Sequence, residues 1–260
     1  MKRTCLLLAA LLLAFVPAAA RTVKKTYDIE DFTGISASGV FQVTLEKSKT
    51  FSVEIEVTED FLPYLVVKNR GGMLELGFAS LPFRLRKKDR SKVAQAVIKM
   101  PVLTAINLSG ASTLTANDQF SNAMNKLSVT LRGSSTVRSL NVKAPDVDIE
   151  ISGTSSAVIN LRSSEVDVEL SGASKLELTG STVDIEAEVR GASRFEAAKC
   201  ETQDLDLTLS GASNADVFPT RSFKVALTGA SKCRYYGDAE KLKVNVVKVT
   251  GASTLKHQEQ

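Results

Sequence analysis

The chain has 260 residues, of which 43% are hydrophobic and 24% charged, and it contains one histidine and no tryptophan. Its formal net charge of +4 at pH 7 is small for this length, which argues against a nucleic-acid partner. The low aromatic content of 6% favours a thin core of Val, Leu and Ile over a deep globular one.

Residues 1–20 have the pattern of a secretory signal peptide. Lys2 and Arg3 precede an apolar run from Leu6 to Val16 that is too short to span a bilayer, and small residues follow at 18–20. Cys5 lies inside the apolar run, so we do not interpret it as a lipid-attachment site. We expect an exported chain that begins at residue 21 and has no transmembrane segment. It would lie in the periplasm, on the outer surface or outside the cell.

Residues 21–100 form an irregular region that we expect to cap a larger repeat domain. Ser38-Gly39 is a degenerate form of the repeated corner described below, and residues 59–65 suit a short helical turn. Alternating apolar and polar residues predict strands in this region. The predicted strands are Phe41–Leu45, Phe51–Val57, Met73–Phe78 and Val93–Met100.

A basic run after Pro82 predicts a protruding loop, bracketed by Pro82 and Ser91, that could bind a partner. The candidate residues are Arg84, Arg86, Lys87, Lys88, Arg90 and Lys92. They suit an anionic glycan, a lipid headgroup or the acidic face of a second copy. The alternative is a solvated loop without a partner. Phe83 is the only aromatic residue nearby, which again argues against single-stranded nucleic acid.

Residues 101–260 contain eight copies of a Gly-centred tetrapeptide of the type Ser-Gly-Ala-Ser. The glycines are Gly110, Gly133, Gly153, Gly172, Gly191, Gly211, Gly229 and Gly251. They are separated by 23, 20, 19, 19, 20, 18 and 22 residues. A period near twenty indicates a stacked repeat in which each unit buries its apolar face against its neighbours.

Apolar residues alternate on both sides of each glycine, which predicts two short half-buried strands per unit. In the unit of Gly172, Val168 and Leu170 precede the glycine and Leu176 follows it. In the last unit, Val247 and Asn245 hold the fourth and sixth positions before Gly251. We therefore predict an all-β fold, a right-handed parallel β-helix with coils of roughly 19–20 residues. A propeller needs longer repeats, and a β-sandwich needs no repeated corner.

A serine stands two residues after every one of these glycines, and we interpret it as a structural residue of the corner. Glycine permits a turn that other residues resist, and the hydroxyl can bond the backbone or the next serine. The only histidine, His257, lies close to the end of the chain, and no general base is paired with the eight serines. Nothing therefore activates them as nucleophiles. We expect no catalytic residues and no cofactor.

Carboxylates occupy the outward positions of four successive units. They are Asp146, Asp148, Glu150, Glu165, Asp167, Glu169, Asp184, Glu186, Glu188, Asp204 and Asp206. The simplest interpretation is a solvated face that prevents lateral sheet pairing. A face that docks basic partners is the functional alternative. Weak cation binding would involve Asp148, Asp167, Glu186 and Asp206, although flat columns do not enclose an ion. Lys175 and Arg194, on the adjoining strand, could neutralise part of this charge.

Cys200 and Cys233 lie in different coils and at different edges of the predicted helix. Their Cα atoms should be too far apart for a disulfide.

The chain resembles the bacterial family called putative auto-transporter adhesin, head GIN domain. The matching residues begin at Phe32-Thr33-Gly34-Ile35, continue through Gly71 to Leu76, and lead through Met100 to Leu103 into the repeats. The resemblance implies an exported β-helix with a surface or adhesive role, and it supplies no catalytic residues.

We therefore expect a non-catalytic adhesin that binds a glycan or a surface protein through its β-helix faces. The alternatives are a self-associating envelope module, which would be a homo-oligomer, and, less favoured, a polysaccharide-active enzyme.

Overall fold

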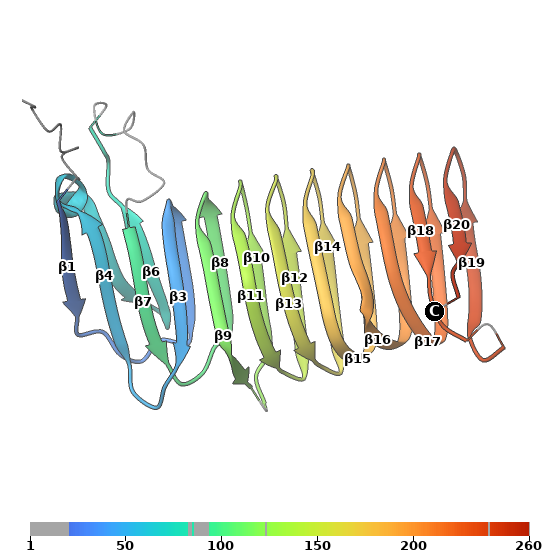
Figure 1. The fold of residues 1–260 in the computed structure, drawn as a ribbon, viewed down its shortest axis with the longest axis horizontal. Coiled ribbons are helices and arrows are strands. Elements are labelled where there is room, and N and C mark those ends of the chain that lie inside the picture. Colours follow the sequence, from blue (N-terminus) through green and yellow to red (C-terminus); the bar gives the residue numbers. More distant parts are fainter. Residues whose placement is uncertain (1–20, 83–84, 86–93, 123, 239, 260) are drawn as a thin grey trace, which may run out of the picture.

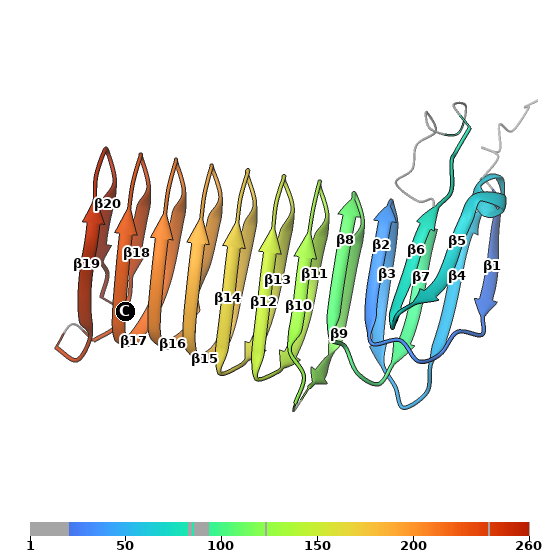
Figure 2. The same cartoon turned by 180° about the vertical axis from the view of Figure 1, so that it is seen from behind.

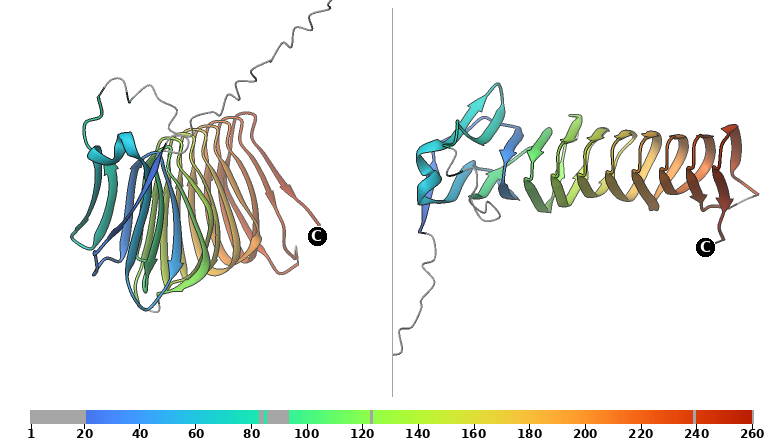
Figure 3. Two further views of the ribbon diagram at one scale, coloured as in Figure 1. Left: turned by 60° about the vertical axis from the view of Figure 1, so that its left-hand side comes forward. Right: turned by 90° about the horizontal axis from the view of Figure 1, so that it is seen from above.

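The computed structural model describes residues 21–82, 85, 94–122, 124–238 and 240–259. It is an elongated stack of β-coils with a cap of different topology at the amino-terminal end (Figure 1). Each coil contributes one strand to each of two facing sheets, as the view along the sheets shows (Figure 3). In the described part of the chain, no helix is long and apolar enough to cross a membrane.

We call the sheet that carries the carboxylates the first sheet. Its parallel strands are β6 (Met73–Phe78), β2 (Gly34–Gly39), β8 (Ala105–Gly110), β10 (Leu127–Leu131), β12 (Asp146–Ile151), β14 (Glu165–Leu170), the later parts of β15 (Lys175–Val189), β16 (Arg194–Leu209) and β17 (Asn214–Leu227), and β19 (Lys243–Val249). At its amino-terminal edge, β5 (Leu65–Arg70) pairs antiparallel with β6.

The second sheet closes the other side of every coil. Its parallel strands are β7 (Ala94–Met100), β3 (Phe41–Lys47), β9 (Thr113–Ser121), β11 (Thr136–Lys143), β13 (Ser156–Arg162), the first parts of β15, β16 and β17, β18 (Lys232–Tyr235) and β20 (Thr254–His257). At the amino-terminal edge, β4 (Ser52–Thr58) pairs antiparallel with β7, and β1 (Thr22–Tyr27) pairs antiparallel with β4. The predicted parallel β-helix is confirmed.

The first coils are not stacked in chain order. The β2–β3 coil lies between the β6–β7 coil and the β8–β9 coil, because β2 pairs with both β6 and β8 and β3 with both β7 and β9. After β7 the chain therefore passes over one coil before the repeats begin, as the view from behind shows (Figure 2). Parallel pairing starts at Gly34, inside the region that we expected to be an irregular cap. The predicted helical turn is a 3₁₀-helix, η1, at Glu59–Tyr64.

The repeated corners form a column along one edge of the stack, at the top in Figure 1. All eight glycines have φ between 74° and 81°, which favours glycine. A Cβ on Gly172 would lie 2.6 Å from the carbonyl oxygen of Gly153 in the preceding coil. The residue after each glycine donates its N–H to that preceding carbonyl, as Ala173 does at 2.8 Å. Ser38-Gly39 is indeed a first corner, since Gly39 stacks under Gly110.

The corner serines are structural, as predicted. The side chains from Ser112 to Ser231 in this column are buried, and all of their hydroxyls except that of Ser155 donate to backbone carbonyls. Ser231, for example, donates to the carbonyl of Thr228 at 2.7 Å. Two corner N–H groups also bond a serine of the next coil, as Ser135 N–H does with Ser155 Oγ at 3.1 Å. The hydroxyl groups are therefore engaged in holding the turn.

One expected register is wrong in the last coil. Val246, not Val247, lies beside Val225, and Val244 rather than Asn245 lies beside Phe223. The register of β19 against β17 shifts between Val225 and Ala226, so that Val247 is an extra residue opposite the partner strand. The bulge absorbs an extra residue in the longer final repeat and returns Val249 to its expected place beside Leu227.

Cys200 and Cys233 are both free and buried, which confirms that they form no disulfide. Cys200 pairs with Gly180 in its neighbouring coil, whereas Cys233 pairs with Ala215 and Leu255, so the two occupy different columns. Burial raises the pKa of the Cys200 thiol to about 11 and raises that of Cys233 as well.

Candidate functional site

The outward carboxylates of the first sheet align in columns, as the sequence predicted. Asp148 lies beside Asp167, Asp167 beside Glu186, and Glu186 beside Asp206. The flanking column of Asp146, Glu165, Asp184 and Asp204 and that of Glu150, Glu169 and Glu188 have the same register. Adjacent strands are about 4.8 Å apart, so each carboxylate has a like-charged neighbour on at least one side. Glu165, Asp167, Glu169, Asp184 and Glu186 have one on both sides. We call these residues the acidic face.

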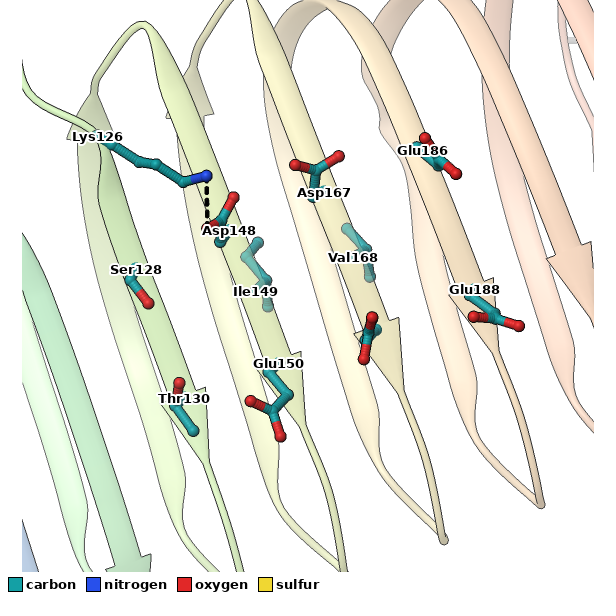
Figure 4. Close-up of a pocket in the computed structure, with 11 residues that line it drawn as sticks. Lys126, Ser128, Thr130, Asp148, Ile149, Glu150, Asp167, Val168, Glu186 and Glu188 are labelled. Atoms are coloured by element: carbon teal, nitrogen blue, oxygen red, sulfur yellow. Dashed lines mark ion pairs between the residues drawn. The ribbon is translucent and has the colours of Figure 1, made fainter.

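Basic residues pair with the carboxylates at both ends of the acidic face. At the amino-terminal end, the Lys126 ammonium lies 2.6 Å from Asp148 (Figure 4) and Arg132 lies 3.0 Å from Glu150. At the carboxyl-terminal end, the Arg221 guanidinium pairs with Asp204 through two nitrogens, and Lys224 pairs with Asp206. Arg190 pairs with Glu188. The partners come from neighbouring coils or from the adjacent corner.

Six carboxylates of the acidic face make no ion pair with any residue that the structure describes. They are Asp146, Glu165, Asp167, Glu169, Asp184 and Glu186. Two shallow grooves cross this region, one of about 470 Å³ and one of about 290 Å³, and both are lined by Asp167 and Glu186. In Figure 4 these two side chains project from adjacent strands to the same side of the sheet. The centre of the face therefore carries negative charge that is not neutralised by ion pairs with described residues.

The pKa shifts reflect this division between the centre and the ends. Partial burial, and secondarily the charge of Asp148, raises the pKa of Asp167 above its ordinary value, although Lys126 opposes the shift. At the other end, the hydrogen bonds from Arg221 lower the pKa of Asp204. The hydrogen bond to Asp148 raises the pKa of Lys126. Within the acidic face, Asp167 is thus the carboxylate whose pKa is raised, and Asp204 the one whose pKa is lowered.

The four residues expected to bind cations weakly share one column but not one environment. Asp148 and Asp206 are each occupied by a lysine, which leaves Asp167 and Glu186 open. Within the residues that the structure describes, no group of three carboxylate, histidine or cysteine side chains is arranged to hold a metal ion. The arrangement suits an extended cationic surface better than a single ion.

Sequence reasoning missed the residues that neutralise the ends of the acidic face. It considered Lys175 and Arg194, but both pair with Glu196 on the second sheet, because the corner turns them to the other side. The register gave a usable signal for Lys224, which holds the position of Asp206 in the next coil. Lys126, in a loop, and Arg221, at the register shift between the two parts of β17, gave no such signal. The basic run from Arg84 to Lys92 lies outside the described residues.

Comparison with known families identifies the chain. A family model described as "Putative auto-transporter adhesin, head GIN domain" matches residues 31–239. The chain belongs to this family. The match spans the amino-terminal coils, the acidic face and the corners up to Gly229, so the resemblance noted in the sequence is confirmed. No curated protein matches the chain.

Solved bacterial structures share the fold. A crystal structure of a putative adhesin from Parabacteroides distasonis superposes with a TM-score of 0.81 at 18% identity, covering 92% of this chain and 98% of that one. A putative adhesin from Parabacteroides merdae gives 0.79 at 20% identity, with 92% and 96% covered. A protein of P. distasonis described as a putative lipid binding protein gives 0.80 at 16%, with 91% and 96% covered. Identities this low show the fold alone.

Proposed function

We propose that this protein is a non-catalytic, exported adhesion protein whose acidic face binds a basic protein surface. The observation that carries the proposal is the group of six carboxylates without ion pairs at the centre of the first sheet. Membership of the adhesin family supports a binding role. Export rests on the signal-peptide pattern of residues 1–20, and amino-terminal sequencing of exported protein should find a chain that begins at Arg21.

The shape and charge of the acidic face favour a protein partner over a small ligand. The grooves are open and shallow. The strands that hold the carboxylates are about 4.8 Å apart, so the carboxylates of each column have a fixed spacing. Lysine and arginine side chains on a partner could pair with several carboxylates at once without a deep cavity. Complementary charge speeds association and fixes orientation, and its contribution weakens as salt rises.

Binding of polymers tests the role of the acidic face directly. Immobilised protein should capture poly-lysine but not poly-glutamate, and added salt should weaken the capture. The triple variant Asp167→Asn, Glu169→Gln, Glu186→Gln should bind poly-lysine about tenfold more weakly, since three exposed pairs are lost. A control variant, Glu30→Gln, Glu177→Gln, Glu201→Gln, removes three charges elsewhere and should bind as the wild type does. Equal loss in both variants would contradict the proposal, because it would show that net charge alone matters.

A second candidate is an anionic glycan or lipid headgroup bound by the basic run. It is supported by the six basic residues between Arg84 and Lys92 and by the neighbour described as a putative lipid binding protein. Glycan-array and anionic-vesicle binding should then disappear when Arg84, Arg86, Lys87 and Lys88 become alanine. Self-association lost in that variant, without glycan or vesicle binding, would favour the envelope module instead.

The non-catalytic assignment has its own test. The buried corner serines form hydrogen bonds with the backbone, and the His257 ring contacts the carbonyl of Gly237 at 2.9 Å, away from the acidic face. A polysaccharide-active enzyme would shorten uronic-acid polymers, and we expect no new reducing ends from such polymers.

A further inference from the structure

The carboxyl-terminal end of the stack exposes the edge of the core. All seven residues of β19 are exposed, and among the described residues this strand pairs only with β17. Val244, Val246 and Val249 are 39%, 49% and 41% exposed, whereas Phe223, Val225 and Leu227 beside them in the preceding coil are fully buried. The last coil therefore presents apolar side chains in the inward columns and one unpaired edge of backbone hydrogen-bonding groups.

The amino-terminal end differs because it is covered. Strands β1 and β4 add antiparallel pairs beyond the β6–β7 coil. The 3₁₀-helix η1 inserts Phe61, which is buried and contacts the ring of Phe78 at 5.8 Å between centroids. Solenoids need such atypical terminal units because an open end exposes both core and strand edge. Within the described residues, nothing equivalent lies beyond β19 and β20.

The outward positions of the last coil are basic and lack carboxylate partners among the described residues. Lys243 and Lys248 lie on β19 and Lys256 lies on β20, and no ion pair joins them to a described carboxylate. One coil earlier, basic side chains do have partners in the coil below: Lys224 pairs with Asp206, and Arg234 pairs with Asp216. In the last coil, Lys256 lies beside Arg234, Lys243 beside Ser222 and Lys248 beside Ala226, so these lysines have no acidic layer next to them. A further layer with carboxylates at its outward positions would supply the missing partners.

We infer that this end is a docking site for an extended segment of a partner protein with alternating aliphatic and acidic residues. The segment adds to β19 and β20 as a further layer by β-augmentation. Its aliphatic side chains cover Val244, Val246 and Val249, and its carboxylates face the three lysines. A second copy docked end to end would instead set β19 against β19, which places lysines near lysines and opposes pairing.

A coil of this same chain provides a suitable probe peptide. Residues 164–178 carry Glu165, Asp167 and Glu169 at the outward positions that correspond to Lys243, Asn245 and Lys248. Val166, Val168 and Leu170 hold the inward positions. The control peptide carries Glu165→Lys, Asp167→Lys and Glu169→Lys and keeps the same apolar residues. Fluorescence anisotropy of each labelled peptide is measured against the full chain.

The full chain should bind the acidic peptide and not the lysine peptide. In the variant Lys243→Glu, Lys248→Glu the preference should reverse, with about tenfold weaker binding of the acidic peptide and new binding of the lysine peptide. The control variant Lys25→Glu, Lys49→Glu makes the same change of charge at the amino-terminal end and should keep the wild-type preference. Hydrogen exchange should show protection of β19 and β20 by the acidic peptide.

Three results would overturn the inference. One is the absence of binding, and another is equal binding of both peptides. The third is a concentration-dependent dimer of the free protein with β19 already protected, which would show that a second copy covers this end. The proposed role of the acidic face is independent of all three, because the β19 variants leave Asp167, Glu169 and Glu186 unchanged.

Discussion

The corner glycines are constrained by two effects that act at the same residue. Positive φ disfavours any side chain, and the neighbouring coil leaves no room for one. At Gly172 both effects operate, since a Cβ would lie 2.6 Å from a backbone oxygen that is itself held by the N–H of Ala173. At Gly71, φ is +58°, but a Cβ added to this residue would have no neighbouring heavy atom within 4 Å.

We predict that Gly172→Ala lowers the free energy of unfolding by about 3 kcal/mol, from backbone strain plus displacement of the adjacent coil. Gly71→Ala should cost about 1 kcal/mol, from the strain alone. Urea denaturation of both variants measures the difference. Similar decreases in the free energy of unfolding of the two variants would show that the Gly153 carbonyl moves aside at little cost. Backbone conformation alone would then explain the glycine.

Asp167 should give stability a specific pH dependence. Because folding raises its pKa above the ordinary 3.8, protonation of this group favours the folded state. The free energy of unfolding should therefore rise as pH falls from neutral through the folded pKa towards 3.8. Asp204 acts oppositely: its pKa is lowered, so its contribution is lost only as pH falls below 3.8.

Asp167→Asn should abolish the increase in the free energy of unfolding that occurs as pH falls from neutral to 3.8. It should also stabilise the protein at neutral pH by about 0.5 kcal/mol, the size expected of partly exposed charges. Asp204→Asn should leave that rise intact and reduce the loss at lower pH. Thermal melts of the three proteins at a series of pH values measure both effects. If the free energy of unfolding still increased to the same extent on acidification of Asp167→Asn, the increase would come from other carboxylates.

At the scale of elements, each coil is stabilised by two neighbours, except at the open end. The inward valines of β19 are covered on one side only, whereas the side chains at equivalent positions on β12 and β14 are buried. We predict that the amide protons of β19 and β20 exchange with deuterium faster than those of β12 and β14, through opening of the last coil alone. Mass-spectrometric hydrogen exchange measures this difference. Equal protection at low protein concentration would mean that the last coil opens only with the whole molecule.

At the scale of the whole molecule, the stack is nearly one-dimensional, so whole coils are interchangeable units. Removing residues 172–190 joins Ser171 to Gly191 and restores the corner sequence and the parity of both strands. We predict a folded protein with a β-type circular dichroism spectrum and a single melting transition, a few degrees less stable than the full chain.

Removing only residues 172–181 should prevent folding, because it deletes a corner and a strand without restoring the register. A folded, cooperative product from this shorter deletion would contradict the coil as the unit of stability. The longer deletion also removes Asp184, Glu186 and Glu188 from the acidic face. The protein with this deletion should therefore bind poly-lysine more weakly than the full chain.

The sequence by itself determined the coils, the corners and the acidic columns. The repeated glycine and the strict alternation of apolar residues leave one arrangement in which every coil buries its inward side chains. Like positions then align across coils, and the alignment of Asp148, Asp167 and Glu186 follows without further information. The separate columns of Cys200 and Cys233 follow from the same register.

The tertiary structure decided what depends on contacts outside this repeat. The β6–β7 coil lies beyond the β2–β3 coil because parallel strands can add to either free edge, and sequence order does not choose between them. The bulge at Val247 placed Val246 in the inward column where alternation predicted Val247, and alternation alone cannot show such a bulge. Lys126 reaches the acidic face from a loop and Arg221 from the register shift within β17, and no periodicity fixes the direction of either side chain. Which carboxylates remain unpaired, and hence where a basic partner would bind, was therefore set only in three dimensions.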